Sequence, residues 1–410
     1  MKKTFYAALG AAFLGAAVTS VDTTALISWA DEPSQVPSAE EIGPGVGPFS
    51  SSGNVGTSPV SKREIGPGVG EETAGGTTLL PVVLVPNDFL NNPIANPIVK
   101  VTDRYTHEQM EADIFALKER YGDKLSVNVI GQSLDNRAIY EIVIGSPEAP
   151  NHILFQGAIH GREYMTPLLM MSQMELALAN YDTGHYNHMA LSDMFGQAAL
   201  HFVPMVNPDG VAVSQSGLSA IRSDSLRQEI IASYHRDVEA GKTDFSLEQY
   251  LPYWKSNARG VDLNHNFPAW WEMIQNPTTA GSYANYKGTA PLSEPESQAL
   301  AALSGQHSWA ATVSYHSMGN IIYWDTDGNQ ASDSSYALAQ AVSQDTGYRL
   351  DPSKGKGGFK DFLQTNGQTA PSVTVETGSL ACPMPVSEFE SVWNQNKSVW
   401  AKVMNYVLHR

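Results

Sequence analysis

The sequence predicts an α/β fold: a mixed, largely parallel twisted sheet with helices on both faces, preceded by a disordered linker. Two observations carry this prediction. Short apolar runs that are typical of buried strands alternate with longer segments of helical periodicity. Several of these runs also end directly before a polar residue. In open α/β sheets ligands bind beyond the carboxyl ends of the strands, so these polar residues are expected to share one site.

The N-terminus has the layout of a secretory signal. Two lysines precede an apolar stretch at 5–21, and small residues lead up to Ala30. The alternative is an uncleaved membrane anchor, but the stretch contains glycines and Asp22 and falls short of a span. We therefore expect a signal peptide over 1–30 and a bacterial protein that is secreted or associated with the cell wall, without a membrane span in its mature form.

Residues 31–100 are predicted to form a linker. Residues 31 to about 80 are rich in Gly, Pro and Ser and contain the heptapeptide Glu-Ile-Gly-Pro-Gly-Val-Gly twice, at 41–47 and at 64–70. Such a composition buries too little apolar surface to offset its chain entropy. From about 81 to 100, four prolines interrupt a more apolar stretch, which is expected to pack along the catalytic domain as extended chain. The repeat is either a duplicated spacer or a recognition tag for another cell-surface component. A single catalytic domain is then expected over 101–410.

The composition of the chain narrows its class. With 410 residues and 42% hydrophobic content it can bury a large core. The net charge of -17, from 25 Lys and Arg against 42 Asp and Glu, argues against a nucleic-acid partner. The only cysteine, Cys382, excludes an intramolecular disulfide and is expected to be buried filler.

Capping patterns mark two helices of the catalytic domain. Thr106 and Gln109 begin a helix, and Ser387 with Glu390 is predicted to begin another near the C-terminus. The polar stretch 214–248 is expected to form helical excursions at the rim of the sheet. The predicted apolar faces consist of Met110, Ile114, Leu117 and Tyr121 in the first helix, and of Phe389, Val392, Trp393, Val399, Trp400, Val403 and Tyr406 in the second.

Four predicted strands each deliver a polar residue at their carboxyl end. Because these ends meet at one edge of a parallel sheet, residues that are distant in sequence become neighbours. The pairs are 153–159 with His160, 199–206 with Asn207, 310–315 with His316, and 371–375 with Glu376.

His160, Glu163 and His316 form a candidate metal-ligand set. Two histidines and one glutamate leave the fourth position of a tetrahedral zinc open for water, which is the arrangement of a catalytic zinc. The alternative is two hydrogen-bonded core histidines and an acid at a helix start. A competing pair, His185 and His188, lies in a predicted loop and is expected to be solvated surface.

These residues and their neighbours resemble the zinc metallocarboxypeptidase family, also called the funnelins or M14 peptidases. The resemblance runs from about residue 102 to the C-terminus and implies a zinc metallopeptidase with one Zn²⁺ per chain, held by His160, Glu163 and His316. The motifs at 286–288, 293–296 and 357–362 look most like the bacterial γ-D-glutamyl-diaminopimelate endopeptidases. The family's motifs are matched, in order, at 160–163, 207–210, 261–267, 314–317 and 375–378.

The resemblance assigns two catalytic roles. Glu376, before Thr-Gly, would be the general base that takes a proton from the attacking water and passes it to the leaving amine. Lys255 stands where the family usually has an arginine upstream of the Asp-x-Asn segment, and would stabilise the developing oxyanion. A lysine keeps the charge but loses the planar fork of arginine.

The resemblance also suggests substrate-binding residues, with two departures from the family pattern. Asn264-His265 replaces the Asn-Arg pair that holds a terminal carboxylate, and an imidazole is a poor substitute for a guanidinium. His265 either faces the substrate or stacks in the wall. Lys360 stands where the family selects the side chain, and either selects a negative charge, such as the extra carboxylate of diaminopimelate, or points to solvent. Phe359 is expected to close over the substrate, and Asn207 to line the site.

Three functions follow from this interpretation. The first is a secreted zinc metallopeptidase that hydrolyses γ-D-glutamyl-diaminopimelate bonds of peptidoglycan stem peptides. The second is a general zinc carboxypeptidase that removes acidic C-terminal residues. The third is a non-catalytic wall-binding relative. The expected partner is a peptide or muropeptide substrate, and the chain is expected to be a monomer.

Overall fold

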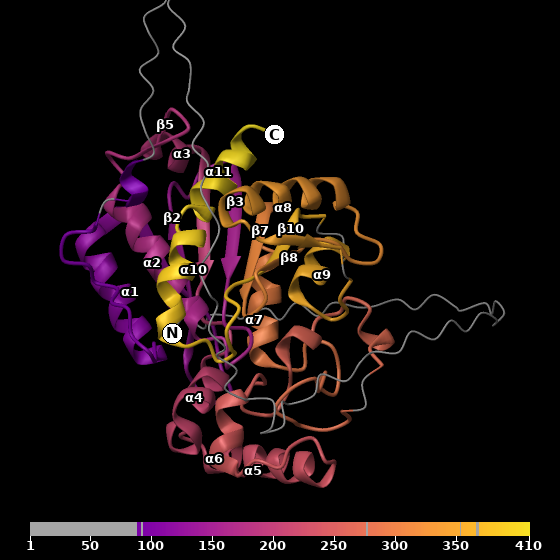
Figure 1. The fold of residues 1–410 in the computed structure, drawn as a ribbon. Coiled ribbons are helices and arrows are strands. Elements are labelled where there is room, and N and C mark those ends of the chain that lie inside the picture. The colour runs from indigo at the N-terminus through magenta and orange to yellow at the C-terminus, as the bar shows by residue number, and fades with distance from the viewer. Residues whose placement is uncertain (1–87, 92, 276–277, 353, 366–368) are drawn as a thin grey trace, which may run out of the picture. The chain divides into compact units, whose positions relative to one another are not determined.

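The computed structural model describes residues 88–410, apart from 92, 276–277, 353 and 366–368 (Figure 1). The predicted signal peptide at 1–30 and both copies of the heptapeptide lie outside the described residues, so these interpretations stay predictions. Of the helices that the structure describes, none combines the length and the apolar character that a bilayer span requires.

A mixed sheet forms the centre of the fold, and within the described residues it has eight strands. The central strands β6, β3, β7 and β10 run parallel, β8 and β9 form a further parallel pair, and the other pairs are antiparallel, which confirms the predicted, largely parallel sheet. A small hairpin, β4 (His185–Tyr186) and β5 (Met189–Ala190), stands apart. In spatial order the strands are β1 (Leu125–Gln132), β2 (Ala138–Ile144), β6 (Ala198–Val203), β3 (Asn151–Gln156), β7 (Trp309–His316), β10 (Ser372–Glu376), β8 (Ile321–Tyr323) and β9 (Arg349–Asp351).

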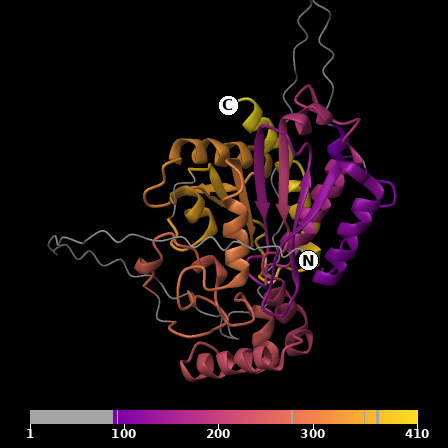
Figure 2. The same cartoon turned by 180° about the vertical axis from the view of Figure 1, so that it is seen from behind.

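Helices cover both faces of this sheet, as predicted (Figures 1 and 2). Side chains alternate between the faces along each strand, so Ile153 and Phe155 enter one core while Leu154 enters the other. The first core is closed by α1 (His107–Tyr121), α2 (Met165–Ala179), α3 (Leu191–Gln197), α8 (Ser332–Thr346), α10 (Phe389–Asn396) and α11 (Val399–Leu408). The second is closed by α7 (Pro295–Ser304) and α9 (Phe359–Thr365).

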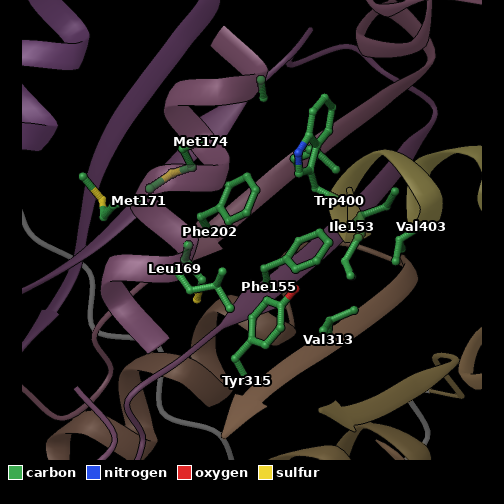
Figure 3. Close-up of a cluster of buried hydrophobic side chains, with 14 of the residues drawn as sticks. Ile153, Phe155, Leu169, Met171, Met174, Phe202, Val313, Tyr315, Trp400 and Val403 are labelled. Carbon is green, nitrogen blue, oxygen red and sulfur yellow. The ribbon is translucent and has the colours of Figure 1, made fainter. Parts of the chain in front are cut away.

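Aromatic side chains lie among the aliphatic residues and methionines of the first core (Figure 3). Phe155 of β3 and Phe202 of β6 stack with ring centroids 5.0 Å apart. The hydroxyl of Tyr315 in β7 accepts a hydrogen bond of 2.9 Å from Gln173 of α2, so the one polar atom of that ring is satisfied. Each such ring contributes about 1.5–3 kcal/mol through its burial, so this layer helps to anchor the strands that lead to the site.

The first capping prediction is confirmed and the second is wrong. Thr106 caps α1 by accepting a hydrogen bond of 3.2 Å from the backbone N–H of Gln109. Ser387 lies inside a short 3₁₀ turn instead, and Glu388 turns back to accept hydrogen bonds from the backbone N–H groups of Ser379 and Leu380. The C-terminal helix therefore begins only at Phe389 and consists of two pieces, α10 and α11.

Further helical segments gather beyond the carboxyl ends of the central strands (Figure 1). The polar stretch 214–248 contains several helical segments, as predicted, and the longest helix there is α5. The segments at this end include α4 (Pro208–Ser216), η4 (Gly217–Ala220), α5 (Asp224–Glu239), α6 (Leu247–Tyr250), η5 (Leu251–Tyr253), η6 (Leu263–His265) and η7 (Trp271–Met273). Elsewhere lie η2 (Asp88–Asn91), η3 (Gly122–Lys124) and η8 (Val386–Glu388).

The described part of the apolar stretch at 81–100 packs along the catalytic domain, as expected. The backbone N–H groups of Ile98 and Val99 each donate a hydrogen bond of 2.8 Å to the carboxylate of Glu175 in α2. Phe89 and Val99 are buried in the first core. The last described residues of the predicted linker are therefore held against the domain by both apolar burial and charge-assisted hydrogen bonds.

Candidate active site

Parallel strand pairing brings three predicted residues to one edge of the sheet. In the register between β3 and β7, Gln156 pairs with Ser314, so the chain leaving β3 towards His160 emerges beside the end of β7. Glu376 of β10 pairs directly with His316 of β7. The carboxyl ends of β3, β7 and β10 thus form the edge that the sequence pattern indicates.

The turn that carries His160 depends on a close backbone approach. Ala158 adopts a left-handed backbone (φ 45°), which turns the chain sharply after β3. Gly161 then packs against Gly210 at the start of α4, and a Cβ atom at Gly161 would lie only 2.3 Å from the Gly210 carbonyl carbon. The N–H of Gly161 donates to the Lys255 carbonyl (2.8 Å). A side chain at position 161 would therefore displace the turn that positions His160.

His160, Glu163 and His316, the His-Glu-His triad, meet as predicted. Nδ1 of His160 lies 2.8 Å from Oε1 of Glu163, and Nδ1 of His316 lies 3.0 Å from Oε2. All three side chains are buried, and their potential ligand atoms lie within 4.8 Å of one another. Burial alone would raise the pKa of Glu163, but the two histidines outweigh it and hold the pKa well below its usual range.

The donor atoms of this triad suit a divalent metal ion. Oε2 of Glu163 is buried and makes no hydrogen bond, although it lies near His316. Two imidazole nitrogens and one carboxylate are donors that zinc accepts, and three protein ligands leave one position open. The residues present therefore fit a catalytic zinc.

Asp262 contacts the triad on the side of His160, a role that no motif in the sequence indicates. Its Oδ1 lies 3.2 Å from Nε2 of His160, so that nitrogen carries the proton and Nδ1 presents its lone pair to the triad. Asp262 is wholly buried and also accepts hydrogen bonds from the backbone N–H groups of Asn264 and Asn285. Burial alone would raise its pKa, but His265, His160 and Lys255 outweigh that effect and lower the pKa well below its ordinary value.

Glu376 lies beside the triad but is more accessible than its members. Burial raises the pKa of Glu376 to about 7, and Glu163 acts in the same direction, whereas His316, Lys255 and Arg162 oppose the rise. A carboxyl group whose pKa lies near neutrality is matched to accepting and releasing a proton. Lys255 is partly exposed, and its positive charge acts to lower the pKa of Glu376.

Comparisons with known proteins decide the family. The profile of the zinc carboxypeptidases matches residues 110–398. The γ-D-glutamyl-L-diamino acid endopeptidase 1 of Lysinibacillus sphaericus is 32% identical over 304 residues, which cover 73% of this chain and 72% of that protein. The chain belongs to the zinc carboxypeptidase family. It is therefore a zinc metallopeptidase that acts on peptide bonds, as the sequence pattern indicated.

Other relatives agree with the zinc carboxypeptidase fold. The uncharacterized protein YqgT of Bacillus subtilis is 26% identical over 282 residues, 67% of this chain and 70% of that protein. The crystal structure of thrombin activatable fibrinolysis inhibitor superposes with a TM-score of 0.58 at 19% identity, covering 78% of this chain and 79% of that chain. Carboxypeptidase A from Helicoverpa armigera gives 0.54 at 17% identity, covering 76% and 74%. At these sequence identities the two structures support only the assignment of the fold.

Asn207 holds the carboxypeptidase site together rather than lining it. Its side chain is fully buried, and its Oδ1 accepts from the N–H of Gly210 and so caps α4. Its Nδ2 contacts the carbonyl oxygens of Ile159, Lys255 and Ser256 at 3.1–3.3 Å. With its polar atoms engaged inside the protein, Asn207 positions the segments that carry His160 and Lys255, which corrects the expected substrate contact.

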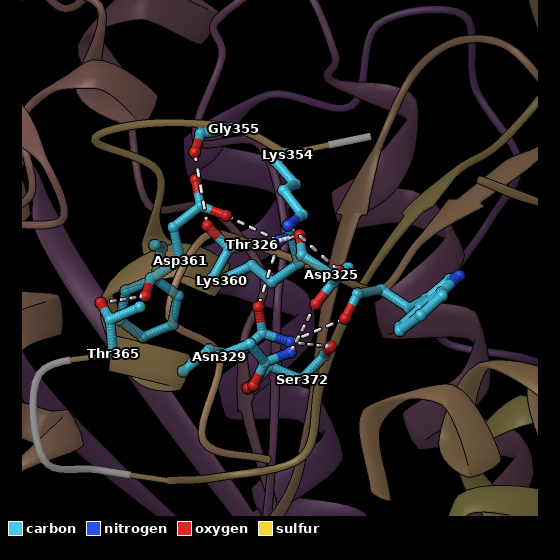
Figure 4. A network of polar contacts seen from close by, with 12 residues as sticks. Asp325, Thr326, Asn329, Lys354, Gly355, Lys360, Asp361, Thr365 and Ser372 are labelled. Carbon is cyan, nitrogen blue, oxygen red and sulfur yellow. Dashed lines mark hydrogen bonds and ion pairs between the residues drawn. The ribbon is translucent and has the colours of Figure 1, made fainter. Parts of the chain in front are cut away.

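Lys360 also differs from the sequence-based expectation. It is buried, and its ammonium group donates to the Asp325 carbonyl (2.6 Å), the Asp361 carboxylate (2.6 Å) and the Gln364 side-chain oxygen (3.2 Å) (Figure 4). An ammonium group has three donors, and all three are used. Lys360 therefore neither selects an acidic substrate side chain nor points to solvent.

Phe359 does not lie over the substrate site as expected. Its side chain is buried in the second core, where it lies 5.2 Å from the ring of Phe267. It is therefore not available to close over a substrate. Its backbone N–H donates to Oδ1 of Asn264 (3.1 Å), so α9 is tied to the segment that follows Asp262.

Asn264 and His265 remain at an accessible position near the triad. Both are only partly buried, and the His265 side chain is 30% exposed. Nδ1 of His265 lies 3.3 Å from Oδ2 of Asp262, the same carboxylate that contacts His160. His185 and His188 lie on the hairpin of β4 and β5, and neither joins a three-ligand group among the residues that the structure describes.

Proposed function

We propose that the chain is an exported zinc peptidase that hydrolyses γ-D-glutamyl-diamino acid bonds in peptidoglycan stem peptides. The proposed substrate follows from the relative in Lysinibacillus sphaericus, whose name states a γ-D-glutamyl-L-diamino acid endopeptidase. Diaminopimelate is the diamino acid that the motifs at 286–288, 293–296 and 357–362 suggest. Export rests on the signal-like pattern at 1–30, and we expect the protein outside the cell or at its wall.

The arrangement that carries this proposal is the buried His-Glu-His triad with Glu376 at the adjacent strand end. His160, Glu163 and His316 would hold one Zn²⁺ per chain. When bound there, zinc supplies a Lewis acid that polarises the scissile carbonyl and makes a water molecule more acidic. Asp262 keeps the proton of His160 on Nε2, so that Nδ1 is free to act as a ligand.

Glu376 and Lys255 are the proposed catalytic side chains. The carboxylate of Glu376 takes a proton from the attacking water and delivers it to the leaving amine, for which a pKa of about 7 is suitable. Lys255 supplies a positive charge at this edge, where negative charge develops on the carbonyl oxygen. Its charge already lowers the pKa of both Asp262 and Glu376, which places its field at the proposed reaction centre.

Asn264 and His265 are the proposed substrate-binding residues. Because Nδ1 of His265 lies against Asp262, only Nε2 of that ring is left for a substrate. One imidazole N–H holds a terminal carboxylate less well than the paired donors of a guanidinium. Weak anchoring of a chain end favours a peptidase that recognises the γ-linked bond itself over one that trims acidic C-terminal residues. The internal ion pair of Lys360 removes the main support for the second function.

One digestion tests the proposal. The purified chain, loaded with Zn²⁺, is given the tripeptide L-Ala-γ-D-Glu-diaminopimelate and, separately, a linear peptide with an acidic C-terminal residue. Mass spectrometry then identifies the fragments. Free diaminopimelate supports the proposal. Release of the C-terminal residue from the linear peptide alone supports the general carboxypeptidase, and no product from either substrate supports the non-catalytic wall-binding relative.

A further inference from the structure

A second group of potential metal ligands lies at the opposite edge of the sheet. It consists of His152, His201 and His307, called here the basal histidine cluster. His152 is the second residue of β3, whereas His160 follows the end of that strand. His201 lies on the neighbouring β6, and His307 lies in the connection between α7 and β7. Their potential ligand nitrogens are within 4.8 Å of one another.

The three rings of the basal histidine cluster face one another. Nδ1 of His152 lies 2.9 Å from Nε2 of His201. The rings of His152 and His307 stack with centroids 4.0 Å apart, and those of His201 and His307 lie 4.9 Å apart. Two imidazole nitrogens cannot approach to 2.9 Å with a lone pair on each, so either a proton or a cation must lie between them.

A carboxylate fixes the orientation of the buried member. Nδ1 of His201 lies 2.7 Å from Oε1 of Glu141 on β2, and the other oxygen of Glu141 accepts a hydrogen bond from Asn128 (2.9 Å). The proton of His201 is therefore on Nδ1, and Nε2 presents its lone pair to His152 and His307. A carboxylate behind a histidine is the usual support of a metal-binding imidazole.

The surroundings hold the cluster in place and leave it open on one side. Trp309 packs edge-on against His201 and His307, with centroids 5.0 and 5.2 Å away, and is itself buried. Its indole N–H donates to the Ser304 carbonyl at the end of α7 (2.8 Å). His201 is buried, but His152 and His307 are partly exposed, so an ion has a route of entry.

We propose that the basal histidine cluster binds a divalent transition metal ion, Zn²⁺ being the first candidate, through one nitrogen of each of its three histidines. Three imidazoles suit zinc, nickel or copper and leave a position for water. Around a tetrahedral zinc the ligand nitrogens lie about 3.3 Å apart, given bonds of about 2.0–2.1 Å. The pair at 2.9 Å needs to open by only a few tenths of an ångström, and His307 needs to approach.

Binding at this cluster has a defined effect on the fold. When the ion takes its place, the proton between His152 and His201 moves from Nδ1 to Nε2 of His152, so that this ring binds the ion in its neutral form. The negative charge of Glu141 offsets part of the ion's charge. The ion ties two strands that backbone pairing already fixes, β3 and β6, to the connection between α7 and β7. It therefore stabilises the fold at the edge away from the His-Glu-His triad and takes no part in hydrolysis.

The first test is zinc stoichiometry, measured by elemental analysis on the chain purified without a histidine tag and dialysed against a small excess of Zn²⁺. We expect two equivalents for the wild type and one each for His307→Ala and His316→Ala. The double variant should hold none. The exposed His235 provides the matched control, and His235→Ala should keep both ions. His307→Ala should retain peptidase activity, because His307 lies outside the proposed active site.

The second test is independent of hydrolysis and of the proposed substrate. In the His316→Ala background, added Zn²⁺ should raise the melting temperature by several degrees, and His307→Ala or His152→Asn should abolish that shift. Two variants are used so that a folding defect in one does not decide the result. The inference is overturned if the wild type binds a single ion that His316→Ala removes and His307→Ala keeps, or if zinc leaves the melting temperature of His316→Ala unchanged.

Discussion

The two edges of the sheet present polar clusters of opposite construction. At the carboxyl edge the donor set includes a carboxylate, that of Glu163, and a second carboxylate, that of Asp262, orients His160. At the other edge the donor set consists of histidines alone and Glu141 is the support. The difference teaches that a carboxylate orients a histidine at both edges, whereas a carboxylate also joins the donor set only beside Glu376, where water must reach an open ligand position.

The largest difference between the edges is expected in catalysis. His316→Ala removes one donor of the His-Glu-His triad. The variant should therefore lose the zinc ion at this site, and its rate of hydrolysis should fall by about a thousandfold or more. Zinc content and release of free diaminopimelate measure the two effects. Full activity in this variant, or in the wild type after exhaustive chelation, would show that hydrolysis does not depend on the triad.

The second-largest effect on hydrolysis is expected for the general base, Glu376. Glu376→Gln keeps the shape of the side chain but cannot accept the proton, so hydrolysis should fall by about 10²–10⁴-fold while zinc at the triad is retained. The exposed Glu390→Gln is the control and should behave as the wild type. An active Glu376→Gln enzyme would assign the base to another group.

The supporting carboxylates allow a matched comparison of the two edges. Asp262→Asn should weaken zinc binding at the triad by about 10–100-fold and lower activity with it. Glu141→Gln should weaken the second zinc equivalent by a similar factor and leave hydrolysis unchanged. The comparison fails if each substitution affects both ions equally, since that would place the two clusters in one coupled unit.

A smaller change, in stability alone, is expected for Lys360. Lys360→Met leaves Asp361 buried without its partner and should lower the free energy of unfolding by about 3–5 kcal/mol. Preference for acidic substrates should not change. Denaturant unfolding measures the loss, and the double variant Lys360→Met, Asp361→Leu should recover most of it. A change in substrate preference would instead show that Lys360 contributes to substrate binding.

The smallest effect concerns a buried acid near the carboxyl edge. Burial raises the pKa of Glu296 to about 8, and its Oε1 has no hydrogen-bond partner. The folded chain therefore keeps a proton that the unfolded chain releases near pH 4.5, so the stabilising contribution is complete below that pH and is lost as the pH rises through 8. Glu296→Gln stays neutral, and its melting temperature should exceed that of the wild type by a few degrees at pH 9 but not at pH 4. Equal melting temperatures at both pH values would contradict the raised pKa.

The sequence predicts the sheet and the His-Glu-His triad because both depend on local patterns. Strands that end in His160, His316 and Glu376 meet through parallel pairing, which the alternation of strands and helices already implies. The same reasoning missed Asp262, since only the 3.2 Å contact with His160 reveals its role.

Side-chain direction explains two of the incorrect predictions. Phe359 and Lys360 were placed near the substrate from their positions in a motif, but each residue of a helix points about 100° away from its predecessor. In α9 the side chain of Phe359 points into the second core, and Lys360 forms an ion pair with Asp361. The basal histidine cluster shows a related limit, because His152, His201 and His307 have no characteristic spacing. They meet only through the pairing of β3 with β6 and the course of the connection that leads into β7.

The pairing of Glu376 with His316 in the β7–β10 ladder has a practical consequence. If β10 slipped by one residue, Val375 would face His316 and the carboxylate would project to the other side of the sheet. Such a molecule would keep most of its secondary structure and could still bind zinc, yet it would be inert. Turnover per zinc-loaded chain therefore gives an assay of how many molecules in a refolded or heterologously expressed batch have aligned these two strands correctly.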